Sequence, residues 1–294
     1  CQVAKATKRV FQVGTQQRSE NGDMFLKAAA LCQDGRLGKI QRVTAIIGGA
    51  PVGGPFPVST PPATLDWDVW QGQTQVTDFI NERCHNNFRW WYEYSGGKMT
   101  DWGAHHVDIA HWVLGASDTG PVSVEGTASH PVPLKDGYPT ETNKYNTATT
   151  FVVTCKFAGG VELIITDNTP EQDNGVLIEG EAGRIFVNRG KLVGKPVEDL
   201  ATNPLSDSLL SKLSKGKKTG NHMQNFIECL KDRGEPISDV FSHHRALTTC
   251  HLANIAIRLG RQLNWNPETE QIVGDDAANA WLSREQRKGF EIVV

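Results

Sequence analysis

Alternating apolar and polar positions between residues 149 and 157 form the clearest pattern in the chain. Phe151, Val153 and Cys155 fall on one side, and the residues between them fall on the other. This is the period of a β-strand, in which successive side chains point to opposite faces. The segment therefore predicts a strand that buries one face.

Other short apolar runs predict further strands of the same kind. They cover residues 40–47, 122–129, 161–167, 175–180 and 184–188, and a glycine-containing turn joins the last two. Together they make about six strands, mostly antiparallel, whose apolar face must be covered by another layer.

Helical periodicity in other segments predicts the layer that covers this face. We expect helices over residues 20–33, with Ser19 as the N-cap, and over 98–114, 222–231 and 243–259. A short strand is expected over 10–13. The predicted fold class is α/β (α+β), with a large open, mostly antiparallel sheet covered by helices.

Charge and cysteine usage exclude several kinds of partner. The 294 residues carry a formal net charge of −3, so we expect no nucleic-acid partner. The six cysteines are scattered without a CxxC pair or zinc-ligand spacing. No apolar run is long enough for a membrane span. We expect no metal and no membrane partner, and a cytoplasmic location, with an exported form left open.

The segment 95–112, SGGKMTDWGAHHVDIAHW, is the best candidate for chemistry. On a helix Asp101, His105 and Asp108 stand at i, i+4 and i+7, and so share one face. A histidine beside a carboxylate suits acid/base catalysis. A hydrogen-bonded structural histidine and a metal site are the alternatives that spacing leaves open.

Two neighbouring groups extend this candidate site. Gly96 and Gly97 precede the helix and allow a close backbone approach. Aromatic and polar side chains precede them and suit a sugar or polyol pocket, although a tryptophan-rich core is an equal alternative. These candidate substrate-binding residues are Arg83, His85, Arg89, Trp91 and Tyr92.

Several motifs are missing from the sequence. It contains no G-x-G-x-x-G after a strand, no P-loop and no H-E-x-x-H. A histidine and a carboxylate cannot carry out redox chemistry alone. Either a cofactor is bound by residues outside this chain, or the reaction is a proton transfer.

The glycine pair and the polar helix face together resemble the catalytic helix of the Gfo/Idh/MocA oxidoreductases. The matching residues are Gly96, Gly97, Asp101, Gly103, His105 and Asp108. The resemblance extends over nearly the whole chain. The segments TLDWDVWQG and WNPETEQIVGDDAANAWLSREQR are similar to a tryptophan-rich bacterial branch of that family.

The resemblance implies a domain organisation and a set of roles. Residues 1–18 would be the C-terminal remnant of a Rossmann dinucleotide-binding domain, and 19–294 the substrate-binding, catalytic and oligomerisation domain. His105 would be the acid/base residue, with Asp101 beside it at the substrate hydroxyl and Asp108 in support. The cofactor would be NAD or NADP, near Gln16, Arg18, Gly96 and Gly97.

The implied function is an NAD(P)-dependent oxidoreductase acting on a sugar, polyol or related hydroxyl compound, and forming a homo-oligomer through the open sheet. The family's glycine fingerprint and Glu-Lys-Pro segment do not occur here, so we expect a fragment that is inactive alone. An NAD-dependent glycoside hydrolase of the same fold and a non-catalytic binding or oligomerisation module are the alternatives.

Overall fold

Nine strands form one large sheet in the computed structural model, which describes residues 1–292. Their order is β11-β10-β2-β5-β6-β1-β7-β8-β9, and β1 and β6 are the one parallel pair. The strands are β1 (Ile40–Ile46), β2 (Ser123–Ser129), β5 (Thr150–Lys156), β6 (Glu162–Thr166), β7 (Gly175–Gly180), β8 (Gly183–Val187), β9 (Leu192–Val193), β10 (Leu263–Asn266) and β11 (Gln271–Ile272). A separate hairpin pairs β3 (Leu134–Lys135) with β4 (Tyr138–Pro139). The predicted large, mostly antiparallel sheet is confirmed.

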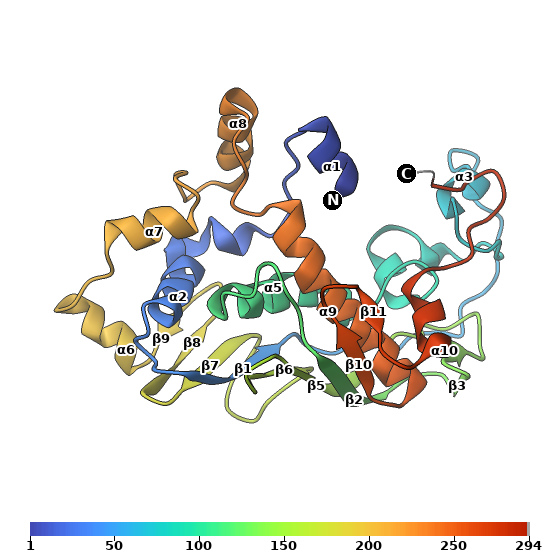
Figure 1. Cartoon of the computed structure of the whole chain (residues 1–294). Helices are drawn as coiled ribbons and strands as arrows, with labels where there is room; N and C mark the ends of the chain where they lie inside the picture. The colour runs from blue at the N-terminus through green and yellow to red at the C-terminus, as the bar shows by residue number, and fades with distance from the viewer. Residues whose placement is uncertain (293–294) are drawn as a thin grey trace.

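Alternation along each strand divides the sheet into a covered and an open face. On β5 the side chains of Phe151, Val153 and Cys155 are buried, whereas Val152 and Lys156 are exposed. The covered face packs beneath helices in Figure 1, and the opposite face looks away from them. One sheet therefore has one apolar and one solvent-facing side, as the period of two required.

Three helices make up most of the covering layer. They are α2 (Met24–Gln33), α5 (Gly103–Val113) and α9 (Val240–Leu259), and α5 contacts the other two. The Asp239 side chain caps α9 by accepting hydrogen bonds from the amides of Phe241 and Ser242. The remaining α-helices are α1 (Gln2–Thr7), α3 (Trp67–Gln71), α4 (Lys98–Asp101), α6 (Lys195–Glu198), α7 (Asp207–Leu213), α8 (His222–Asp232) and α10 (Asp276–Asn279), and short 3-10 helices include η1 (Gln16–Arg18) and η4 (His85–Trp90). None of the helices in residues 1–292 is long and apolar enough to cross a membrane.

The start of the chain differs from the prediction in two ways. Residues 10–13 do not form a strand, and only Gln12 pairs, through a single bridge to Asp239. Ser19 does not cap a helix, because its hydroxyl is buried against the Nδ1 of His222 at 2.7 Å. Left-handed backbone at Asp23 delays α2 until Met24.

The boundary between the two predicted domains passes through a packed region. Thr15, Gln17, Arg18 and Ser19 are all buried, whereas α1 has no buried residue. The amide of Val13 donates to the carbonyl of Ser238, just before α9. The segment leading up to residue 19 is thus part of the same packed unit as the helices, and α1 projects from it (Figure 1).

Candidate active site

The candidate site lies at one end of the sheet. Because β1 and β6 are parallel, their carboxyl ends at Ile46 and Thr166 lie side by side, and antiparallel β7 begins opposite them at Gly175. The helical segment α4–α5 starts at the same end, where a Cβ at Gly48 would lie 4.0 Å from the Lys98 side chain. The topology therefore brings the predicted catalytic helix to this edge.

His105 lies on α5 with an unused ring nitrogen. It is partly buried, and its Nδ1 is shielded from solvent without a hydrogen-bond partner in the described residues. Its ring meets that of Trp102 edge-on, with 5.9 Å between centroids. Burial, followed by the positive charge of Arg189, lowers the pKa of His105, while Asp108 and Asp101 act in the opposite direction. The ring is therefore neutral near pH 7 and free to accept a proton.

Asp101 is held by cations at the start of the same helical segment. Its Oδ2 is 3.0 Å from Nη1 of Arg89 and 4.0 Å from Nζ of Lys98. All three side chains remain partly exposed. The carboxylate is consequently fixed in orientation without being sealed from a ligand.

The prediction that Asp108 shares the open face of Asp101 and His105 is wrong. Asp108 is fully buried, and its two oxygens accept hydrogen bonds of 2.8 and 2.6 Å from Nε and Nη2 of Arg18. Although burial alone would raise the pKa of Asp108, the adjacent Arg18 and His243 lower it well below the usual range. The carboxylate is buried because a buried guanidinium from elsewhere in the chain pairs with it.

His243 joins this ion pair from α9. Its Nε2 lies 3.3 Å from Oδ1 of Asp108 and 2.5 Å from the Thr15 hydroxyl, and its Nδ1 donates to the carbonyl of Asp239. Arg18 also donates to the carbonyl of Ile237. The network fastens the segment before α2 to both α5 and α9, immediately behind the face that carries His105.

His106 forms a second buried link. The Gln17 amide donates to its Nδ1 at 3.3 Å, and its Nε2 donates to Oδ1 of Asn174 at 2.8 Å. Burial lowers the pKa of His106 to about 4. This neutral ring connects the N-terminal segment with the loop before β7, and it has a structural role.

The Gly96–Gly97 pair is needed for packing within the chain. A Cβ at Gly96 would lie 2.5 Å from Nδ2 of Asn254, and one at Gly97 would lie 2.7 Å from Thr147. Their amides already donate, to Thr100 Oγ1 and to the Arg89 carbonyl. The close backbone approach predicted here is thus made to the protein itself.

Replacing Gly97 by Ala should destabilise the chain by about 2–3 kcal/mol, because Gly97 has φ +64° and ψ −154° and no space for a Cβ. Chemical unfolding monitored by tryptophan fluorescence measures the change. Gly115→Ala is the matched control, since Gly115 has φ +66° and open space around it. It should cost about 1 kcal/mol. Equal losses in the two variants would contradict the packing argument.

Most of the predicted aromatic pocket is a second hydrophobic core, separate from the one beneath the main helices. Trp91 is fully buried, and its indole nitrogen donates to the carbonyl of Glu82. The buried Arg83 stacks on Trp91, with 4.2 Å to the ring centroid, and pairs with Glu93 at 3.1 Å. Arg83 and Trp91 therefore have structural partners within this core.

The other predicted site residues are spread around this core. Tyr92 is buried and its hydroxyl meets Nε2 of His130 at 3.0 Å. His85 and Gln16 are exposed. Arg89 is the substrate-site candidate that the structure places beside Asp101. Within residues 1–292, no group of three or more His, Cys, Asp or Glu side chains is arranged to hold a metal ion.

Three residues near His105 or its neighbour His106 were not predicted. Lys98 begins α4, Asn174 precedes β7, and Arg189 sits in the turn between β8 and β9 with its guanidinium 4.5 Å from the Trp102 ring centroid. The basic residue within GGK was a visible signal for Lys98. The sequence gives no signal for Arg189, because its position depends on how the hairpin packs.

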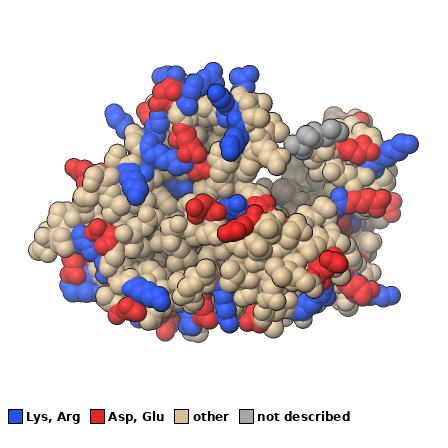
Figure 2. Space-filling model, viewed as in Figure 1, with Lys and Arg blue, Asp and Glu red and all other residues tan. Residues whose placement is uncertain are grey.

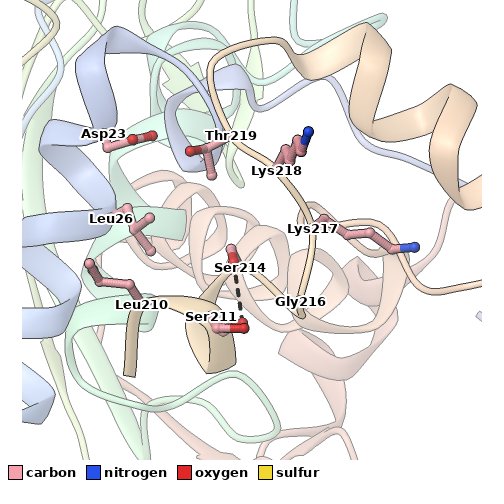
Figure 3. Close-up of a pocket in the computed structure, with 9 residues that line it drawn as sticks. All are labelled: Asp23, Leu26, Leu210, Ser211, Ser214, Gly216, Lys217, Lys218 and Thr219. Atoms are coloured by element: carbon pink, nitrogen blue, oxygen red, sulfur yellow. Dashed lines mark hydrogen bonds between the residues drawn. The ribbon is translucent and has the colours of Figure 1, made fainter. Parts of the chain in front are cut away.

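A separate hollow of about 490 Å³ opens between α2, α7 and the segment before α8 (Figure 3). Basic side chains gather on the face shown in Figure 2, and Lys217 and Lys218 line the hollow. Lys217 pairs with Asp232, and Lys215 with Asp239, so much of this charge is neutralised internally. In Figure 3 the ends of Lys217 and Lys218 point away from Leu26 and Leu210. The hollow shares no residue with the His105 site.

The fold and the matching helix motif define the class of protein as an α/β domain of an oxidoreductase family. Residues 55–292 match the family described as "Oxidoreductase family, C-terminal alpha/beta domain". The chain belongs to the Gfo/Idh/MocA oxidoreductase family, as the motif predicted. A search among curated proteins finds no match to this sequence.

Solved structures show the same fold at low identity. The WlbA dehydrogenase from Bordetella pertussis, in complex with NADH and UDP-GlcNAcA, is 17% identical with a TM-score of 0.55. Aldose-aldose oxidoreductase from Caulobacter crescentus, complexed with glycerol, is 16% identical with a TM-score of 0.54. Each likeness covers 90% of this chain and 66% of the other. The chain therefore spans slightly less than two thirds of these relatives.

Proposed function

We propose that the whole protein is an NAD(P)-dependent oxidoreductase acting on a hydroxyl group of a sugar or polyol, and that this chain supplies its substrate site. The unused, buried Nδ1 of His105 beside Asp101 is the observation that carries the proposal. A nitrogen shielded from water without a partner is unfavourable unless a ligand meets it. The WlbA dehydrogenase and the aldose-aldose oxidoreductase support this reading, since both bind sugar-related or polyol ligands.

In this mechanism His105 is the general base. The neutral imidazole accepts the hydroxyl proton through Nδ1, as its lowered pKa allows. Asp101, fixed by Arg89, accepts a hydrogen bond from the substrate and orients it. When bound, a nicotinamide cofactor would supply the hydride acceptor for the carbon that bears this hydroxyl. The buried Arg18–Asp108 pair does not touch substrate and holds α5 in place from behind.

The described residues could contact such a cofactor only where it meets the substrate, and they do not provide a site for its phosphates. They contain no glycine-rich turn between a strand and a helix to hold its phosphates. The helix α8 instead buries His222 and Cys229 and exposes Met223, Ile227 and Leu230. An apolar helix face left in solvent indicates a covering partner. We assign this role to a preceding dinucleotide-binding domain, of which residues 1–18 would be the end.

The full-length protein is the material for the test. It is incubated with NAD+ or NADP+ and a panel of aldoses, uronates and polyols, and formation of the reduced cofactor is followed by absorbance. Oxidation of at least one compound is expected. Release of a sugar leaving group without net reduced cofactor would favour the glycoside hydrolase alternative. Neither reaction across the panel would favour the non-catalytic alternative.

We further propose that the open face of the sheet joins two copies of the chain. Val152 lies on this face at the centre of β5 and is 50% exposed. Val152→Lys should therefore convert the oligomer into monomers, because it would bury a new charge in the contact between the copies. Light scattering after size-exclusion chromatography measures the mass. Val58→Lys, at an exposed valine outside the sheet, should leave the mass unchanged.

A further inference from the structure

A row of alternating cations and aromatic rings lies beside His105. Arg89 stacks on Trp90 at 4.7 Å, and Nζ of Lys98 lies 5.6 Å from Trp90 and 5.9 Å from Trp102. Arg189 stacks on Trp102 at 4.5 Å. The three cations come from separate segments: Arg89 from the 3-10 helix His85–Trp90, Lys98 from the first residue of α4, and Arg189 from the β8–β9 turn. The fold therefore gathers positive charge around Trp90 and Trp102, and the Trp102 ring meets the ring of His105.

The charge in this row is not balanced. Asp101 is the one carboxylate paired with it among residues 1–292, through Arg89 and Lys98. Arg189 forms no ion pair within that part of the chain. Three positive charges thus meet one negative charge, whereas in the hollow of Figure 3 Lys217 is paired with Asp232.

Partial burial makes the positive charges of Lys98 and Arg89 unfavourable in the free protein. The Lys98 side chain is 20% exposed and that of Arg89 is 32% exposed. Desolvation lowers the pKa of Lys98, and the neighbouring Arg89 adds to this effect, against the opposing influence of Asp101. A bound anion would offset both the desolvation of Lys98 and its repulsion by Arg89. If the anion is part of the substrate, its charge-assisted hydrogen bonds to these cations would also strengthen substrate binding.

We propose that Arg89, Lys98 and Arg189 bind an anionic group of the substrate, either a carboxylate or a phosphate ester, while His105 meets a hydroxyl of the same molecule. This inference rests on the proposed function for the hydroxyl and names the substrate class. The substrate would then be an acidic or phosphorylated sugar. Arg189 is a specificity residue of this subsite, because a neutral sugar would gain little from it.

The test measures binding directly, without cofactor and without turnover. Glucuronate, glucose 6-phosphate, glucose, acetate and inorganic phosphate are titrated into the protein, and the imidazole NMR signals of His105 are followed. Both acidic sugars should bind more tightly than glucose and weaken as salt is added. Comparison of the two shows whether carboxylate or phosphate is preferred.

The decisive variant is Arg189→Gln, since Arg189 is exposed in a turn and the change should leave folding intact. It should weaken binding of the preferred acidic sugar about tenfold, as expected for loss of one charge-assisted contact. Arg189→Lys should restore part of the affinity. Lys191→Gln is the matched control, because Lys191 lies in the same hairpin over Phe186 and should have no effect.

Two results would overturn the inference: glucose binding as tightly as either acidic sugar, or no shift of the His105 signals with any probe. A third would be weaker binding of NADH, with unchanged sugar binding, in Arg189→Gln, since the subsite would then serve the cofactor. Failure of the proposed function is distinguishable. Acidic sugars would still bind in the Arg189-dependent way, but the full-length protein would reduce no cofactor.

Discussion

Asp108→Asn is expected to destabilise the protein by about 3–5 kcal/mol, as for other buried ion pairs that lose one partner. The change removes the charge but keeps the shape, so Arg18 stays buried without its counter-charge. Asp108 and Arg18 side chains are 1% and 3% exposed, and water cannot replace the lost partner. Urea unfolding followed by circular dichroism measures the difference.

Two further variants separate the ion pair from other effects. The double variant Arg18→Met/Asp108→Leu should lose less than Asp108→Asn, because neither charge is then left unpaired. Glu162→Gln is the surface control, since its partner Arg42 is 52% exposed and the loss should stay below about 1 kcal/mol. A loss equal to that of the control would contradict the assigned role of the pair.

The same pair predicts a dependence of stability on pH. The pKa of Asp108 is lower in the folded protein than in the unfolded chain. The ionised carboxylate therefore adds its full contribution to the free energy of unfolding above the unfolded pKa of about 4. That stabilisation is lost as the pH falls toward the folded pKa. Wild-type protein should therefore lose more stability than the Arg18→Met/Asp108→Leu variant between about pH 4 and pH 2.

His105→Ala is expected to reduce turnover by the full-length protein by about 10²–10⁴-fold, the usual contribution of a general base. The histidine packs against Trp102 without a hydrogen bond from Nδ1, so removing it should leave the unfolding midpoint nearly unchanged. Steady-state rates with the preferred substrate measure the effect. His244→Ala, at an exposed histidine on α9, is the matched control and should retain full activity.

The pH profile gives an independent test of the same role. A base must be neutral, and the pKa of His105 lies below the ordinary value of 6.5. The rate should therefore fall only as the pH drops below about 6.5, and the acidic limb should disappear in His105→Ala. An unaltered limb in that variant would assign the base to another group.

Much of the fold was predictable because its signals are local. The alternation at Phe151, Val153 and Cys155 determines which face of β5 is buried, whatever its neighbours. The long helix α9 was predicted within a few residues. The weak points were short segments such as 10–13, where an apolar run cannot distinguish a strand from a buried loop.

The candidate site was predictable only in part. The motif placed Asp101 and His105 on one helical segment, and Arg89 close before it in the sequence also reached the site. Arg83, Trp91 and Tyr92 belong to a buried core or its edge. Large aromatic side chains are stabilised by burial inside the protein, so their presence alone does not indicate a ligand pocket. Periodicity assigns a residue to a helix face but does not say what covers that face.

The sequence by itself determined the alternation of the strands, the order of the helices and the single helical segment that carries Asp101 and His105. These depend on neighbours within a turn or a strand. Only the tertiary structure decided that Asp108 is buried, because its partner Arg18 lies 90 residues away. It likewise brought Arg189 to Trp102 through the β8–β9 turn. Contacts between distant segments depend on how layers pack, and no local pattern encodes them.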